Sequence, residues 1–274
     1  MPGLLASVLH LAYPAQALIA TLCTWGITAL GACVVFLLKT PNRNLMDALL
    51  GMAGGVMVAA SFWSLLAPSI EMAEALEMCP WGTAALGFLG GGALLFLGDR
   101  AFHAVSEKRA ALPSPAMDES GWKRCTMLLF SITLHNIPEG MAIGVAFGSL
   151  AYGLEGSTPG GAWLLALGIG LQNLPEGMAV SVPLRREGLS RRQSFFYGQL
   201  SGLAEPVSGF LGALLVLKVR SCLPVLLAFA AGAMIYVVVE ELIPESQTNE
   251  NKDFMALFTL VGFAVMMVMD VALG

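Results

Sequence analysis

The sequence predicts an all-α fold: a polytopic membrane protein built as a bundle of eight transmembrane helices with pseudo-symmetric repeats. Three observations predict it. Of the 274 residues, 57% are hydrophobic and only 12% are charged, whereas soluble globular chains carry about 25% charged residues. Apolar runs long enough to cross a bilayer, about 20 residues each, recur along the whole chain. Two neighbouring runs contain near copies of one polar hexapeptide.

The eight runs form one transmembrane domain over residues 1–274. We expect the spans at 16–38, 47–70, 80–99, 124–150, 160–184, 193–217, 221–243 and 253–273. The longest connection, 100–123, is polar and contains Pro113 and Pro115, so we expect a flexible loop there. The five cysteines show no CxxC spacing, which argues against a structural zinc cluster or a disulfide framework.

Basic residues predict the orientation. Twelve of the 14 lysines and arginines lie in the connections after the first, third, fifth and seventh spans. Lys218 and Arg220 alone lie on the other side. By the positive-inside rule the first set is cytoplasmic, and an even number of spans then places both termini outside. We expect an integral protein of a bacterial cytoplasmic membrane.

Two hexapeptides interrupt the fourth and fifth spans: His135-Asn136-Ile137-Pro138-Glu139-Gly140 and Gln172-Asn173-Leu174-Pro175-Glu176-Gly177. An ionised residue at the centre of a membrane helix costs roughly 2.5–3.5 kcal/mol. In each copy a polar side chain lies four residues before the glutamate, so the two share a helix face. The proline cannot donate to the carbonyl four residues back, which predicts a bend.

Both copies lie at the same depth. His135 is about 11 residues into the fourth span and Gln172 about 12 into the fifth, which runs the opposite way. At 1.5 Å per residue both lie roughly 15–18 Å deep, near the middle of a ~30 Å core. The pattern is typical of inverted repeats that meet at a midplane site. One copy alone could equally be a kink beside a buried, protonated glutamate, but two copies at matched depth favour a site.

A third acidic residue, Glu205, lies in the middle of the sixth span, again next to a proline. Together with Glu139 and Glu176 it would cost on the order of 8–10 kcal/mol if all three were charged and unpaired. No lysine or arginine lies inside these spans, so a divalent cation is the favoured partner. The histidine nitrogen and amide oxygens of the hexapeptides suit zinc and its first-row neighbours better than calcium or magnesium.

Further residues are weaker candidates for a metal path. Met57 could add a thioether in the second span, although one methionine among 15 is ordinary packing. Ser64 falls near the helical face of Met57. The last candidates are acidic residues at the ends of spans: Glu71, Glu240, Glu241 and Asp270. At a span end, a carboxylate can simply be solvated by water instead of lining a metal path.

The doubled HNxPEG and QNxPEG motifs, the eight spans and the external termini resemble the ZIP family of divalent-metal transporters. The stretches 59–68 (AASFWSLLAP) and 236–245 (YVVVEELIPE) are similar to its GufA-like branch. The resemblance implies a binuclear centre. One metal would be held by Met57, His135, Glu139, Gln172 and Glu176, and the second by Asn136, Glu139, Asn173, Glu176 and Glu205.

The resemblance also implies a function. We expect import of Zn²⁺ into the cytosol by alternating, elevator-like access without catalytic chemistry; Cd²⁺, Mn²⁺, Fe²⁺ and Cu²⁺ are further candidate substrates. Gln172 replaces a histidine that many members carry, which blurs the metal preference. The alternative is an intramembrane zinc-dependent hydrolase, although its usual HExxH signature is absent. The expected partners are the metal and membrane lipid, without nucleic acid. The small-residue stripes indicate close packing within one chain, and they leave a monomer and a homodimer open.

Overall fold

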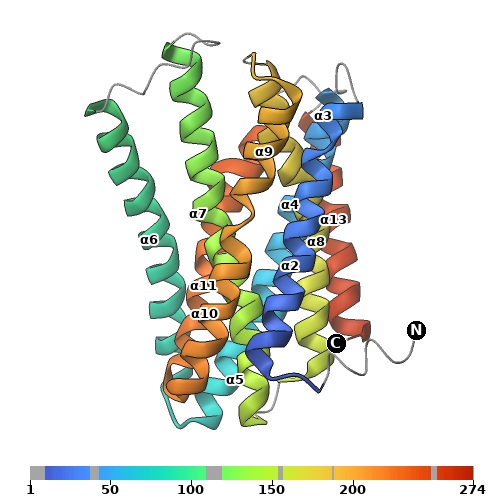
Figure 1. Ribbon diagram of the computed structural model, residues 1–274. Helices are drawn as coiled ribbons and strands as arrows, with labels where there is room; N and C mark the ends of the chain where they lie inside the picture. The colour runs from blue at the N-terminus through green and yellow to red at the C-terminus, as the bar shows by residue number, and fades with distance from the viewer. Residues whose placement is uncertain are drawn as a thin grey trace.

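The computed structural model describes residues 10–37, 43–108, 119–153, 157–186, 188–247 and 252–273. Within these ranges, the side chains of residues 43, 102–108, 119–128, 131, 135, 186, 220 and 273 are not described. The described chain is helical and contains no strand. Its long helices run side by side along one axis (Figure 1).

The helices fall into eight long segments, as the sequence predicts. The first four are α2 (Tyr13–Ala32) with the short α3 (Val34–Leu37); α4 (Arg43–Ala60), continued by the π-helix η1 (Ser61–Leu66) and α5 (Ala67–Ala75); α6 (Pro80–Lys108); and α7 (Glu119–Ser149) with the 3₁₀ turn η2 (Leu150–Tyr152). The last four are α8 (Pro159–Arg186); α9 (Arg191–Ser201) with α10 (Ala204–Lys218); α11 (Leu223–Val237), preceded by η3 (Arg220–Cys222) and continued by the π-helix η4 (Val238–Leu242) and α12 (Ile243–Ser246); and α13 (Lys252–Leu273).

Six of these segments are long and apolar enough to cross a membrane. They are Tyr13–Leu37, Asn44–Ala75, Pro80–Ala101, Arg191–Lys218, Leu223–Ser246 and Lys252–Ala272. The other two are α7 and α8, which carry the polar hexapeptides and correspond to the spans expected at 124–150 and 160–184. The chain is therefore an all-α integral membrane protein.

Prolines act differently at different sites. Pro138 and Pro175 lie inside helices that run on without a break. The span expected at 193–217 is instead divided between α9 and α10, where the amide of Glu205 bonds the carbonyl of Gly202 at 3.1 Å. Pro206 then falls in the first turn of α10, where a missing N–H costs no helix hydrogen bond. The break ends one helix and starts the next directly beside Glu205.

Four helix pairs pack with their backbones in contact: α2 with α8, α7 with α10, α4 with α13, and α6 with α11. A glycine makes each approach feasible, because an added Cβ would overlap a carbonyl oxygen of the partner helix. The overlaps are Gly177 on Thr28, Gly140 on Glu205, Gly55 on Thr259, and Gly232 on Phe88. Gly87 and Gly91 of α6 likewise approach α11 closely. Small residues thus set the helix spacing, as is usual where lipid provides no hydrophobic drive.

Candidate metal centre

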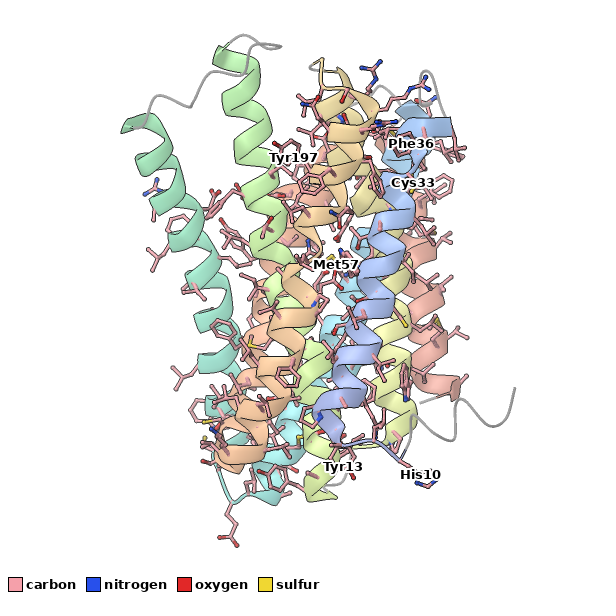
Figure 2. All side chains as sticks on the ribbon, in the orientation of Figure 1. His10, Tyr13, Cys33, Phe36, Met57 and Tyr197 are labelled. Carbon is pink, nitrogen blue, oxygen red and sulfur yellow. The ribbon has the colours of Figure 1, made fainter. Side chains whose placement is uncertain are left out.

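The sequence-predicted ligands lie in the buried middle of the bundle. The helix α7 provides Asn136 and Glu139, α8 provides Gln172, Asn173 and Glu176, α10 provides Glu205, and α4 provides Met57. None of these side chains is more than 5% exposed. Figure 2 labels Met57 about halfway along the bundle. His135 belongs to α7, but its side chain lies outside the described residues.

Two hydrogen bonds join the helices of the centre. The Nε2 of Gln172 donates to Oε1 of Glu139 at 2.8 Å, which links α8 to α7. The Nδ2 of Asn173 donates to Oε1 of Glu205 at 2.8 Å, which links α8 to α10. Both donors come from the fifth-span hexapeptide, so adjacent residues of one helix hold carboxylates of two others.

The first hexapeptide is anchored in a similar way. The Nδ2 of Asn136 donates to the carbonyl of Ile132 at 2.9 Å, one turn back, and to the carbonyl of Ser201 at 3.3 Å on α9. The amide nitrogen is thereby committed to backbone oxygens. The side-chain oxygen Oδ1 is left as the group available to a ligand.

The three glutamates lie close enough to repel one another when they are ionised. Glu139 lies within electrostatic range of both Glu176 and Glu205, and Glu176 lies within range of Glu205. Among the side chains that the structure describes, no lysine or arginine is buried with them. Because repulsion between buried like charges is only weakly screened, the arrangement favours a bound cation.

The strongest indication of a ligand is a set of buried oxygens without hydrogen-bond donors. They are Asn136 Oδ1, Glu139 Oε2, Gln172 Oε1, Asn173 Oδ1 and Glu176 Oε2. Buried polar atoms are normally paired, and all five of these are acceptors. Carboxylate and amide oxygens are ligands that divalent cations take. The donor chemistry of these residues therefore fits a metal ion.

The carboxylates are not gathered into a closed cage. In the described part of the chain, no three His, Cys, Asp or Glu side chains stand close enough to hold one ion. Glu205 is instead turned toward Asn173 and toward Thr24 of α2, whose hydroxyl donates to Oε2. The number of ligands available to one ion therefore depends on the side-chain amides of the hexapeptides and on the orientation of Glu205.

Thr24 and Thr28 are contacts that the sequence reasoning missed. Both are buried on α2. The hydroxyl of Thr24 donates to the carboxylate of Glu205, and that of Thr28 donates to the carbonyl of Thr24 at 3.4 Å. A signal was present, because Thr21, Thr24 and Thr28 recur at helical spacing in an otherwise apolar run. Because the first span contains no charged residue, this threonine pattern could not be told apart from ordinary helix packing.

The candidate path residues divide into two ends. At one end, the hydroxyl of Ser64 on η1 donates to Oδ1 of Asp270 on α13 at 2.7 Å. At the other, Glu241 on η4 lies within electrostatic range of Glu176, while its neighbour Glu240 is exposed. Glu71 is exposed on α5, and no contact joins it to the centre.

Comparison with known proteins identifies the family. The family model of the ZIP zinc transporters matches residues 118–270. The chain is 38% identical to "Zinc transporter ZIP11" of Xenopus tropicalis, over 94% of this chain and 97% of the relative. It is 36% identical to "Zinc transporter ZIPB" of Bordetella bronchiseptica, over 90% and 78%. It is 33% identical to "Zinc transporter GufA" of Myxococcus xanthus, over 94% and 98%.

These relatives are named transporters rather than enzymes, so the hydrolase alternative gains no support. The resemblance carried by the two hexapeptides is confirmed, including its GufA-like branch. The chain belongs to the ZIP family of zinc transporters.

Proposed function

We propose that this chain carries Zn²⁺ across the membrane into the cytosol through a two-ion centre at the bilayer midplane. The observation that carries the proposal is the set of five buried, donorless oxygens beside three mutually repelling carboxylates. An ion held by carboxylates and amides is bound strongly enough to lose part of its water, yet weakly enough to leave on the other side. Cd²⁺, Mn²⁺, Fe²⁺ and Cu²⁺ remain candidate competitors.

The ligand sets are those that the family resemblance implies, and the donorless oxygens of Asn136, Glu139, Gln172, Asn173 and Glu176 are compatible with them. The first ion would use Glu139, Gln172 and Glu176, joined by Met57 and His135. The second would use Asn136, Asn173 and Glu205, with Glu139 and Glu176 bridging the two ions. Apart from Met57 of α4, each set draws on helices that the hydrogen bonds of Gln172 and Asn173 already tie together.

We further propose an elevator-like movement between two helix groups. The carrier group comprises Tyr13–Leu37, Glu119–Ser149, Pro159–Arg186 and Arg191–Lys218, and the frame group comprises Arg43–Ala75, Pro80–Lys108, Leu223–Ser246 and Lys252–Leu273. All three site glutamates lie in the carrier group. Several described glycines would bring an added Cβ within 3.0 Å of a backbone atom of another helix. In every such case, that helix belongs to the same group as the glycine. Backbone contact therefore stiffens each group internally.

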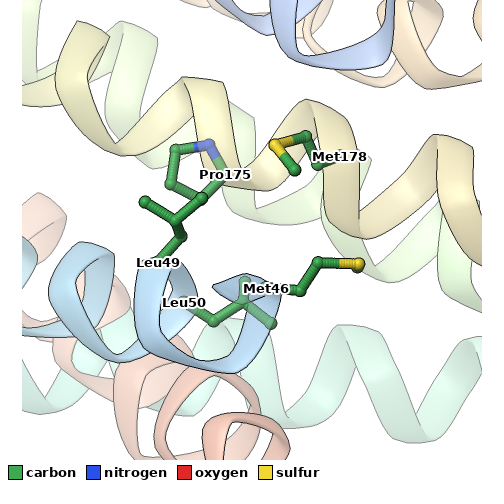
Figure 3. Close-up of a pocket in the computed structure, with 5 residues that line it drawn as sticks. All are labelled: Met46, Leu49, Leu50, Pro175 and Met178. Atoms are coloured by element: carbon green, nitrogen blue, oxygen red, sulfur yellow. The ribbon is translucent and has the colours of Figure 1, made fainter. Parts of the chain in front are cut away.

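The boundary between the groups is made by side chains. A small apolar hollow lies there, lined by Met46, Leu49 and Leu50 of α4 and by Pro175 and Met178 of α8 (Figure 3). It adjoins Glu176, the next residue after Pro175. Flexible methionines adapt to changing surroundings, which supports sliding at this face.

An inverted repeat would explain the helix pairing. In such a repeat the first, second and third spans correspond to the sixth, seventh and eighth, and the fourth corresponds to the fifth. This exchange converts the helix pair α2–α8 into the pair α10–α7. The same exchange converts α4–α13 into α11–α6. The second and seventh spans, which it also exchanges, each contain a π-helix that ends two residues before a proline, Pro68 or Pro244. Such bulges often occur at functional positions.

The orientation and the membrane remain proposals. We place the α8–α9 connection, with exposed Arg185, Arg191 and Arg192, on the cytoplasmic side by the positive-inside rule. Ser64 and Asp270 would then lie on the entry side, and Glu240 and Glu241 on the release side. The bacterial cytoplasmic membrane stays a prediction, because the relatives come from vertebrates and bacteria alike.

Uptake into sealed liposomes tests the proposal. The purified full-length chain should accumulate a radioactive zinc tracer inside the vesicles, and an ionophore should release it. Accumulation no greater than in protein-free liposomes would refute transport. A competition series with the other divalent metals, in the same vesicles, then ranks the substrates.

A further inference from the structure

Glu205 differs from the other two site carboxylates in being fully hydrogen-bonded. Its Oε1 accepts from Asn173 at 2.8 Å, and its Oε2 accepts from Thr24. In contrast, Glu139 and Glu176 each keep an Oε2 with no partner. Glu139 and Glu176 therefore each have an oxygen available to bind an ion, whereas both oxygens of Glu205 accept hydrogen bonds from the protein.

The hydroxyl of Thr24 has a second acceptor within reach. It lies 3.0 Å from the carbonyl oxygen of Thr21, one turn earlier on α2. A threonine hydroxyl has one proton, so it can serve Glu205 or Thr21 at any moment. When Glu205 turns to an ion, the hydroxyl can donate to Thr21, and no buried donor is left unpaired.

We propose that Thr24 is a positioning residue that holds Glu205 away from the centre and sets the affinity for the second zinc ion. The inference rests on the two-ion function proposed above and adds a residue of the first span to it. The first ion finds its acceptors free. The second must displace the Thr24 hydroxyl from Glu205, so it binds more weakly and leaves more easily.

Thr24→Val tests the proposal, because valine has the shape of threonine without the hydroxyl. Glu205 then loses a donor in the empty state, and the second ion no longer competes with it. We expect the second zinc to bind about tenfold more tightly, equivalent to about 1.4 kcal/mol, with the first unchanged. Thr24→Ser restores the hydroxyl and should return wild-type affinities.

Thr21→Val is the matched control. Thr21 is equally buried on α2, but its hydroxyl donates to the carbonyl of Ala17 at 2.8 Å and touches no site carboxylate. Equilibrium dialysis of the purified full-length chain against radioactive Zn²⁺ gives both affinities. In liposomes, Thr24→Val should lower KM and kcat together, because tighter binding slows release.

The outcomes separate the two proposals. Wild-type protein that binds two zinc ions, with Thr24→Val unchanged or weaker at the second, overturns the role of Thr24 and leaves the transport proposal intact. Wild-type protein that binds fewer than two ions overturns the two-ion centre, and the role of Thr24 with it. An equal gain in Thr21→Val would also overturn it, since the effect would then belong to α2 in general.

Discussion

Gly177 allows a direct test of how the centre is held together, because the backbones of α8 and α2 meet there. A Cβ at this position would overlap the carbonyl oxygen of Thr28 and lie 2.9 Å from the amide nitrogen of Ala32. Both atoms belong to the backbone, so no change of rotamer relieves the overlap. Gly177→Ala must therefore push the two helices apart one turn from Thr24.

The magnitude follows from two opposing terms. Alanine is favoured over glycine in a helix interior by about 0.8–1.0 kcal/mol, whereas overpacking typically costs about 1–3 kcal/mol. Gly26→Ala in α2 is the matched control, because an added Cβ there meets nothing within 4 Å. The propensity gain is common to both variants, so their difference in unfolding free energy isolates the overlap, about 1–3 kcal/mol.

The assay is reversible unfolding in mixed micelles, combined with zinc affinity by equilibrium dialysis. We expect Gly26→Ala to be slightly stabilised with normal zinc binding, and Gly177→Ala to be less stable and to bind zinc more weakly. Equal stabilities in the two variants would refute the reasoning, because the backbone contact between α2 and α8 would then carry no energetic weight.

Three further changes test the remaining assignments. Glu176→Ala should abolish most zinc uptake while the protein remains in the membrane at normal level, which immunoblotting and tracer uptake measure. Cysteines at Met46 and Met178, joined by a reducible bifunctional reagent, should stop uptake by tying the carrier group to the frame group, and reduction should restore it. Ser64→Ala removes the hydrogen bond to Asp270, so uptake should slow while equilibrium zinc binding stays unchanged.

Each of these changes has a control. Glu74→Ala removes an exposed carboxylate and should leave uptake normal, and normal uptake in Glu176→Ala as well would contradict the assignment. A cross-link between α4 and α13, both in the frame group, should be harmless. If it blocks uptake equally, the movement does not occur between the proposed groups. Weaker equilibrium binding in Ser64→Ala would move Ser64 from the path to the centre.

The sequence was sufficient for the architecture because composition and length leave few alternatives in a membrane. All eight spans exist as helices, and Glu139 and Glu176 of the polar hexapeptides lie within electrostatic range of each other and of Glu205. Buried charges in apolar runs are costly, so their positions carry information about the site that most residues of a membrane helix do not.

Local backbone details were not predictable in the same way. The chain breaks between α9 and α10, just before Pro206, whereas Pro138 and Pro175 lie in continuous helices. All three prolines follow or precede a glutamate in an apolar run, so the local pattern does not separate them. The π-helices η1 and η4 insert an extra residue per turn, which leaves no mark on hydrophobic periodicity at this length.

Thr24 illustrates a further limit. A threonine in an apolar helix usually bonds its own backbone, as Thr21 does with Ala17. What distinguishes Thr24 is that α2 crosses beside α10 at the level of Glu205. That relation depends on Gly140, which sets the spacing of α7 and α10, and on Gly177, which sets the spacing of α8 and α2. Tertiary packing, rather than residue type, gives this side chain its role.

The attachment of α13 has a practical consequence for handling the protein. Only 17% of its apolar window is buried, against 61% for Asn44–Ala75. Its backbone contacts run to α4 through Gly55 and Gly262. Harsh detergents that strip annular lipid would thus loosen α13 before the rest of the bundle. Asp270 would move away from Ser64 with it, so a solubilised sample could retain ion binding and yet have lost the proposed entry path.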